Sequence, residues 1–160
     1  MFRIGDKAVY PGHGVGVIEA IETKQISGKE QSFFMLRIVD NGMTIMIPQD
    51  NVAGVRLREV IRKIDVSKVI QILKDRDITL DNQTWNRRYR EYMEKINTGS
   101  IYEIAEVLRD LHLLKAAKEL SFGERKIMDV AKNLLVKELA IARDVKESDI
   151  LREIKTIFGS

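Results

Sequence analysis

The sequence of 160 residues contains no cysteine, which excludes disulfide bonds, thiolate metal sites and cysteine nucleophiles. Histidine is nearly absent too: His13 and His112 lie far apart and have no carboxylate at ligand spacing, so neither indicates a metal site. There is no apolar run of about 18 residues and no basic segment leading into an apolar one at the start, which argues against a membrane span or an export signal. These absences favour a soluble, cytoplasmic protein that holds neither a metal nor a cofactor.

Motifs of the common enzyme classes are missing as well. The stretch PGHGVG has glycines at Gly12, Gly14 and Gly16, but their spacing differs from GxGxxG, and an extended run follows where a phosphate-binding loop would lead into a helix. We therefore interpret it as a turn in a strongly curved sheet. Because GxSxG and HExxH are also absent, we predict a binding or interaction protein rather than an enzyme.

Basic residues exceed acidic ones only slightly, with 27 Lys and Arg against 24 Asp and Glu and a net charge of +3. An excess of this size does not by itself indicate nucleic-acid binding. If the chain binds DNA, its positive charge has to be concentrated locally. The densest positive stretch is TWNRRYREYM, which sets Arg87, Arg88 and Arg90 beside Trp85, the one tryptophan of the chain.

The pattern of the sequence changes near residue 56 and predicts an α+β protein of two domains. Before that point, short β-rich apolar runs alternate with turn signals such as DNG at 40–42, as is typical of a small antiparallel sheet or barrel. After it, proline is absent and helical periodicity takes over. We predict a β-rich domain over residues 1–56 and a compact all-helical domain over 57–160, without a flexible Gly/Ser linker between them.

The helical half is expected to contain six helices, with serines near several of their starts. They span 57–63, 66–76, 82–97, 100–114, 121–143 and 147–158. Ser121 and Glu124 have the spacing of a capping box, in which each side chain accepts a hydrogen bond from the backbone amide of the other residue.

Two interpretations of the tryptophan are open. Apolar residues recur from it at helical spacing, so the ring can simply begin a stripe that packs into the core, and periodicity alone favours this reading. The stripe would contain Trp85, Tyr89, Tyr92, Met93 and Ile96. Alternatively, because Trp85 starts its helix, the ring can protrude beside Arg88 and stack or wedge against bases while arginines hold phosphates.

Four separated motifs follow one another along the chain: GDKAVYPGHGVG, NGMTIMIP, TWNRRYREYMEK and LSFGERK. In this order they resemble the CarD/CdnL family of bacterial transcription regulators over essentially the full length. The resemblance implies an N-terminal Tudor-like domain, shared with a transcription-repair coupling factor, that binds a lobe of the RNA polymerase β subunit. It also implies a helical C-terminal domain that touches promoter DNA at the upstream edge of the transcription bubble.

The resemblance assigns roles to individual residues. On the DNA side it implies that Trp85 wedges into the minor groove, supported by Arg87, Arg88, Arg90, Met93, Phe122, Arg125 and Lys126. On the polymerase side it implies contacts from Lys24, Met46, Ile47 and Pro48. Some relatives carry basic residues where Met46 and Leu114 stand, so polar contacts there are not expected in this chain. An edge strand ending at Pro48 would offer amides that a partner sheet can extend.

The expected function is therefore stabilisation of the open promoter complex by a monomer that performs no chemistry. Two other classes remain. One is a Tudor-like protein or peptide interaction module without a DNA role, in which Tyr10, Phe33 and Phe34 form an aromatic cage for a cationic side chain. The other is an enzyme whose site carries no familiar motif.

Overall fold

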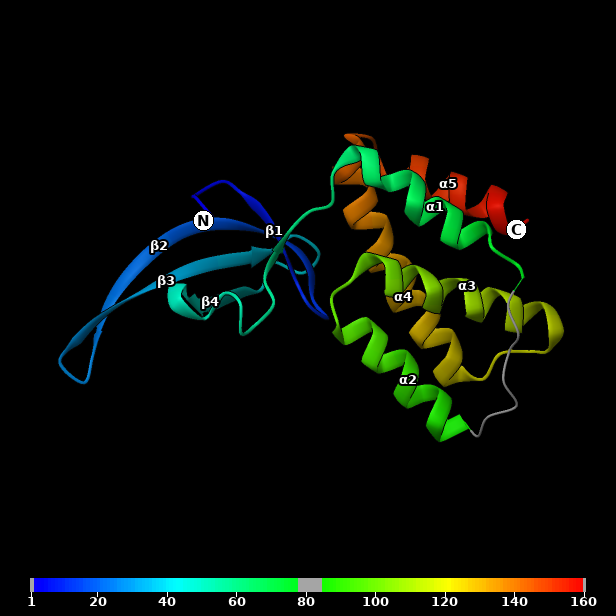
Figure 1. Cartoon of the computed structure of the whole chain (residues 1–160), viewed down its shortest axis with the longest axis horizontal. Coiled ribbons are helices and arrows are strands. Elements are labelled where there is room, and N and C mark those ends of the chain that lie inside the picture. Colours follow the sequence, from blue (N-terminus) through cyan, green and yellow to red (C-terminus); the bar gives the residue numbers. More distant parts are fainter. Residues whose placement is uncertain (1, 78–84, 160) are drawn as a thin grey trace. The chain divides into compact units, whose positions relative to one another are not determined.

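The structure is a computed structural model that describes residues 2–77 and 85–159, with Trp85 and Asn86 described by their backbone alone. The chain divides into two compact units, Met1–Val60 and Ile61–Ser160, and each is described by itself. The first unit is built on a β-sheet and the second on helices (Figure 1). The predicted α+β class is thus confirmed.

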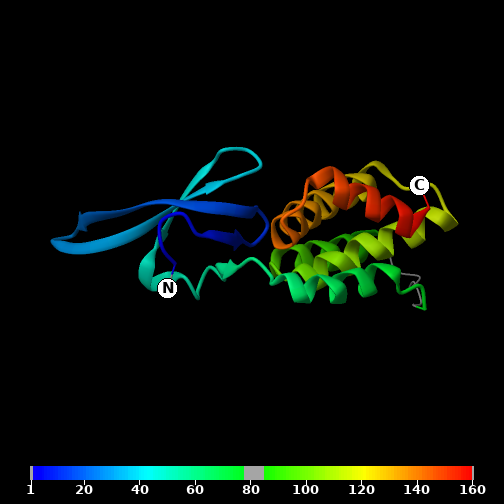
Figure 2. The same cartoon turned by 90° about the horizontal axis from the view of Figure 1, so that it is seen from above.

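Five strands form the sheet of the first unit in the order β4-β3-β2-β1-β5, with every neighbouring pair antiparallel. They are β1 (Lys7–Tyr10), β2 (Gly14–Ile26), β3 (Lys29–Ile38), β4 (Thr44–Pro48) and β5 (Arg58–Glu59). The long strands β2 and β3 form a hairpin that is seen from above in Figure 2 and whose curvature is plain in Figure 1, with a shift in register between Ile18 and Ala20. Such a bulge bends and twists its strand, which helps the sheet to curve over its apolar core.

Glycines allow the tight geometry around β1 and β2. The stretch PGHGVG forms the turn between these strands and the start of β2, as predicted, with positive φ at Gly12 (79°) and Gly14 (94°). At Gly16 the constraint is space: a Cβ there would lie 2.7 Å from the Leu36 side chain and 2.9 Å from the carbonyl oxygen of Arg37. A side chain at this position would therefore push β2 and β3 apart.

In the residues that the structure describes, the second unit has five α-helices that enclose one apolar core. They are α1 (Val66–Lys74), α2 (Trp85–Asn97), α3 (Ile101–Ala117), α4 (Phe122–Arg143) and α5 (Glu147–Phe158). The capping box predicted at the start of α4 is present: the Glu124 amide donates to Ser121 Oγ at 3.2 Å, and the Ser121 amide donates to Glu124 Oε1 at 2.9 Å.

The helix predicted over 57–63 is wrong. Arg58–Glu59 form β5, which pairs with β1, and Lys63–Asp65 form a single 3-10 turn ahead of α1. Leu57 is buried in the core of the sheet unit, whereas Ile61 packs against the core of the helical unit, so the apolar residues of this segment do not share one helix face. Contact with β1 and with this core outweighs the local helical pattern, because propensity is a weak preference in so short a segment.

The end of α5 is fixed to the helical unit by a ring contact and a hydrogen bond. His112 of α3 stacks on Phe158, with centroids 4.0 Å apart and ring planes at 7°, and Arg76 donates to the Ile157 carbonyl oxygen at 2.8 Å. Within the described part of the chain, His112 Nε2 is buried without a hydrogen-bond partner. Burial, together with the charges of Lys115 and Lys132, lowers the pKa of His112 to about 4.

We expect acid to weaken this unit through His112. Its pKa is about 4 in the folded chain and 6.5 in its ordinary state, so the unfolded chain binds the proton more tightly. The contribution of neutral His112 to the free energy of unfolding is fully present above about pH 6.5. It falls by at most about 3 kcal/mol as the pH drops toward 4. His112→Phe keeps a stacked ring that cannot titrate. Urea unfolding between pH 7 and 4.5 should show a smaller loss for this variant, and equal losses would contradict the assignment.

Candidate nucleic-acid and protein interfaces

Helix α2 buries only part of the predicted apolar stripe. Tyr92 and Ile96 are in the core and Met93 packs against it. Tyr89 is 45% exposed, so its place in a buried stripe is wrong. Among the described side chains of α2, the buried face is therefore formed by residues of its later turns. The side chain of Trp85 lies outside the described residues.

The three arginines of α2 have different surroundings. Arg87 is exposed and lies 3.7 Å from Glu91, one turn further on, and Arg90 is exposed as well. The side chain of Arg88 is only 18% exposed, and its Nη1 donates to Glu124 Oε2 of α4 at 3.2 Å. Arg87 and Arg90 thus have side chains open to solvent, whereas Arg88 joins two helices.

Glu124, the partner of Arg88, was predicted from the sequence only as a member of the capping box of α4. Its side chain is 1% exposed and also accepts from Lys118 Nζ at 3.2 Å, beside the bond from the Ser121 amide. Burial on its own raises the pKa of the Glu124 carboxyl. The hydrogen bonds from Ser121 and Lys118, and the charge of Lys118, outweigh burial and hold that pKa below its usual value. The carboxylate therefore stays charged.

The Arg88–Glu124 pair places the first turns of α2 and α4 side by side (Figure 1). We call this region the α2–α4 end, defined as residues 85–93 and 122–126. Phe122, the first residue of α4, is 76% exposed, and Arg125 and Lys126 are exposed next to it. Leu114 is buried in the core. Exposed guanidinium groups beside an exposed aromatic ring suit a partner that is flat and polyanionic.

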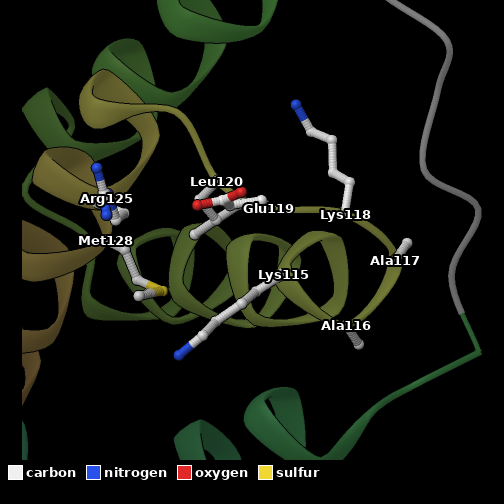
Figure 3. A pocket seen from close by; sticks show the side chains of 8 residues that line it. All are labelled: Lys115, Ala116, Ala117, Lys118, Glu119, Leu120, Arg125 and Met128. Carbon is white, nitrogen blue, oxygen red and sulfur yellow. The ribbon is translucent and has the colours of Figure 1, made fainter.

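A cavity of about 550 Å³ borders the α2–α4 end around the α3–α4 loop (Figure 3). It is lined by Lys115, Ala116, Ala117, Lys118, Glu119, Leu120, Arg125 and Met128. Figure 3 shows the ammonium groups of Lys115 and Lys118 pointing in opposite directions. Since its cations do not converge, the cavity adds positive charge to this border without forming a site for one small anion.

On the first unit, β4 forms one edge of the sheet. Met46 is 43% exposed, whereas Ile47 is 1% exposed and belongs to the core, so the side chain of Ile47 is not available to a partner. The Ile38 amide donates to Met43, and hydrogen-bonded pairs alternate along an antiparallel ladder. The backbone groups of Thr44 and Met46 therefore point away from β3, toward the open edge.

The remaining predicted residues of the first unit flank this edge. Pro48 ends β4 and pairs with Phe33, and its missing amide would stop any added ladder there. Lys24 of β2 is exposed, faces Gln31 of β3, and lies 4.0 Å from Glu22. Lys24 is thus separated from β4 by one strand.

The aromatic cage considered as an alternative is not formed. Phe33 and Phe34 are buried, and Tyr10 contacts His13 edge-on with centroids 5.2 Å apart. In residues 2–77 and 85–159, no three His, Cys, Asp or Glu side chains are grouped to hold a metal ion. No helix in these ranges is long and apolar enough to cross a membrane.

Two family models match the chain, one for each unit. The CarD-like/TRCF RID domain matches residues 2–61 and the CarD C-terminal domain matches residues 68–155. A similar protein is YdeB of Bacillus subtilis (strain 168), named as a candidate transcription factor. It is 37% identical over 152 residues, which cover 94% of this chain and 97% of YdeB.

Two solved structures are each similar to part of the chain. CdnLNt from Myxococcus xanthus is 56% identical, with 38% of this chain and 86% of that chain covered and a TM-score of 0.33. The NMR structure of the 72-residue N-terminal domain of Myxococcus xanthus CarD is 30% identical, with 37% and 79% covered and a TM-score of 0.32.

A sheet unit and a helical unit that both match domains of transcription proteins define a transcription regulator. The chain belongs to the CarD family, as its four motifs predicted: the C-terminal model alone spans more than half of it, and YdeB is similar along nearly its whole length.

The unequal settings of the arginines give a stability test. Arg88→Ala removes one partner of a buried carboxylate and should lower the free energy of unfolding by about 2 to 4 kcal/mol. Arg87→Ala removes only an exposed i,i+4 pair and should change it by less than about 0.5 kcal/mol. Urea denaturation of both variants measures the difference, and similar values would show that the Arg88–Glu124 pair contributes little to folding.

Proposed function

We propose that this chain docks on the RNA polymerase β subunit through strand β4 and stabilises the open promoter complex with the α2–α4 end. In this proposal Trp85 wedges into the minor groove at the upstream edge of the bubble. Arg87, Arg90, Arg125 and Lys126 hold nearby phosphates. The protein acts as a monomer in the cytoplasm, at the nucleoid.

One observation carries the DNA part of the proposal. The Arg88–Glu124 pair joins the helix that begins with Trp85 to the helix that begins with the exposed ring of Phe122. Apolar and cationic side chains from two helices thus meet at one end of the helical unit. Such a combination is what minor-groove wedges and base-stacking surfaces use, with little dependence on sequence.

Membership of the CarD family and the open edge of β4 support the docking part. A sheet edge with outward amides can accept a further strand from a partner, and the exposed Met46 side chain adds an apolar contact. Docking would raise the effective concentration of DNA at the α2–α4 end, so weak contacts there suffice. No bond is made or broken: the protein favours one state of the polymerase by binding it more tightly.

The docking site can be tested with Met46→Asp in the full chain. A charge in an apolar interface should weaken capture of RNA polymerase by roughly 2 to 5 kcal/mol, while the fold tolerates the change because Met46 is exposed. Ile26→Asp, at the exposed tip of the β2–β3 hairpin, is the matched control and should bind like the wild type. Undiminished capture by Met46→Asp would remove β4 as the docking strand.

The wedge can be tested with Trp85→Ala. Loss of a stacked base contact worth about 1 to 3 kcal/mol should make open complexes decay roughly 5 to 150 times faster, with polymerase capture and melting temperature nearly unchanged. Tyr92→Ala, from the buried face of the same helix, should instead lose about 3 to 5 kcal/mol of folding stability. If Trp85→Ala behaves like Tyr92→Ala and open-complex lifetime does not respond, the tryptophan is a core residue.

A further inference from the structure

The two carboxylate oxygens of Glu124 serve different parts of the helical unit. Oε1 accepts from the Ser121 amide at 2.9 Å and from Lys118 Nζ at 3.2 Å, which closes the start of α4 and holds the preceding loop. Oε2 accepts from Arg88 Nη1 of α2 at 3.2 Å. The two bonds to Oε1 come from residues close in the chain, whereas the Arg88 bond to Oε2 joins residues 36 positions apart. Capping α4 therefore does not require the second oxygen.

The position of Arg88 makes this second oxygen important for α2. Arg88 lies three residues after Trp85, close to one helical turn. Further along α2, the helix is held by the buried Tyr92 and Ile96 and by the Lys95–Glu106 pair with α3 at 2.9 Å. A side chain that wedges between bases has to keep its orientation, so the first turn of α2 needs a stabilising contact in addition to those of the later turns.

We propose that Glu124 is a positioning residue: through Arg88 its buried carboxylate fixes the Trp85-bearing end of α2 against α4, so that the tryptophan and Phe122 meet DNA together. The inference rests on the proposed function and deepens it. Glu124 itself does not touch the DNA. The Glu124 carboxylate is 1% exposed and has two cationic partners. The loss of either partner would leave a buried charge less compensated, so the positions of both side chains are restricted.

Glu124→Gln separates the two tasks of the side chain. A glutamine at this position still supports a capping box through its carbonyl oxygen. Its amide group, however, presents donors to Arg88 where the carboxylate presented an acceptor, and its neutral side chain no longer attracts the guanidinium. Ser121→Ala does the reverse: it removes the hydroxyl that accepts from the Glu124 amide and leaves the carboxylate in place.

The experiment measures open-complex decay at 25 °C with the full chain and RNA polymerase, beside melting curves. We expect Glu124→Gln to make decay roughly 3 to 30 times faster. Ser121→Ala should lower the melting temperature by roughly 3 to 10 °C yet leave the decay rate within about twofold. Glu106→Gln applies the same chemical change to the Lys95–Glu106 pair, which joins α2 to α3, and should leave decay unchanged.

The double variant with Trp85→Ala and Glu124→Gln distinguishes positioning from a separate contact. If Glu124 acts through the tryptophan, the double variant decays no faster than Trp85→Ala alone, because the contact that Glu124 supports is already lost. Additive effects, or a Glu124→Gln variant with the decay rate of the wild type, overturn the positioning role while the wedge stands. If Trp85→Ala itself leaves decay unchanged, the proposed function fails.

Discussion

The buried carboxylate of Glu124 is the interaction that holds the α2–α4 end together. A charged group with almost no access to water is stable only when nearby donors replace the lost solvent. Those donors come from the loop before α4, from the start of α4 itself and from α2. One buried ion thus links the loop before α4, the start of α4 and the first turn of α2.

The two units offer different kinds of surface, and the difference follows from their secondary structure. A sheet has an edge, and its outward amides suit a partner that supplies another strand. A helix has no free amides along its length, so the helical unit can present only side chains and helix ends. In the proposed function, the sheet unit therefore binds its partner through the backbone and the helical unit through side chains.

Much of the fold could be predicted, because its signals are local. The glycines of the β1–β2 turn and the Ser121–Glu124 capping box act within a few residues, and both were read correctly. The failures involve distant partners. Arg58–Glu59 become a strand only because β1 is beside them, and Tyr89 is exposed because the core lies on the side of Tyr92. The Arg88–Glu124 pair, 36 residues apart, leaves no periodic trace in the sequence.

Family resemblance supplied what local signals could not, namely which residues to consider as a site. It assigned Arg88 the same role as Arg87 and Arg90, since all three are arginines in one short stretch. Their surroundings separate them: the Arg88 side chain is 18% exposed, and that of Arg87 is 70% exposed. The burial of a side chain depends on the folded structure, so the sequence alone does not distinguish Arg88 from Arg87.

Helix α4 carries a second buried carboxylate, Glu138, which accepts the backbone amide of Ile61 at 3.0 Å. Ile61 is the first residue of the helical unit, where the chain arrives from the sheet unit. Glu138 and Glu124 are 14 positions apart on one uninterrupted helix, about 21 Å at 1.5 Å per residue. One continuous helix thus holds both the first residue of the helical unit and the start of α2. If the proposed contacts with polymerase and DNA form, α4 is the rigid element that a force between them would cross.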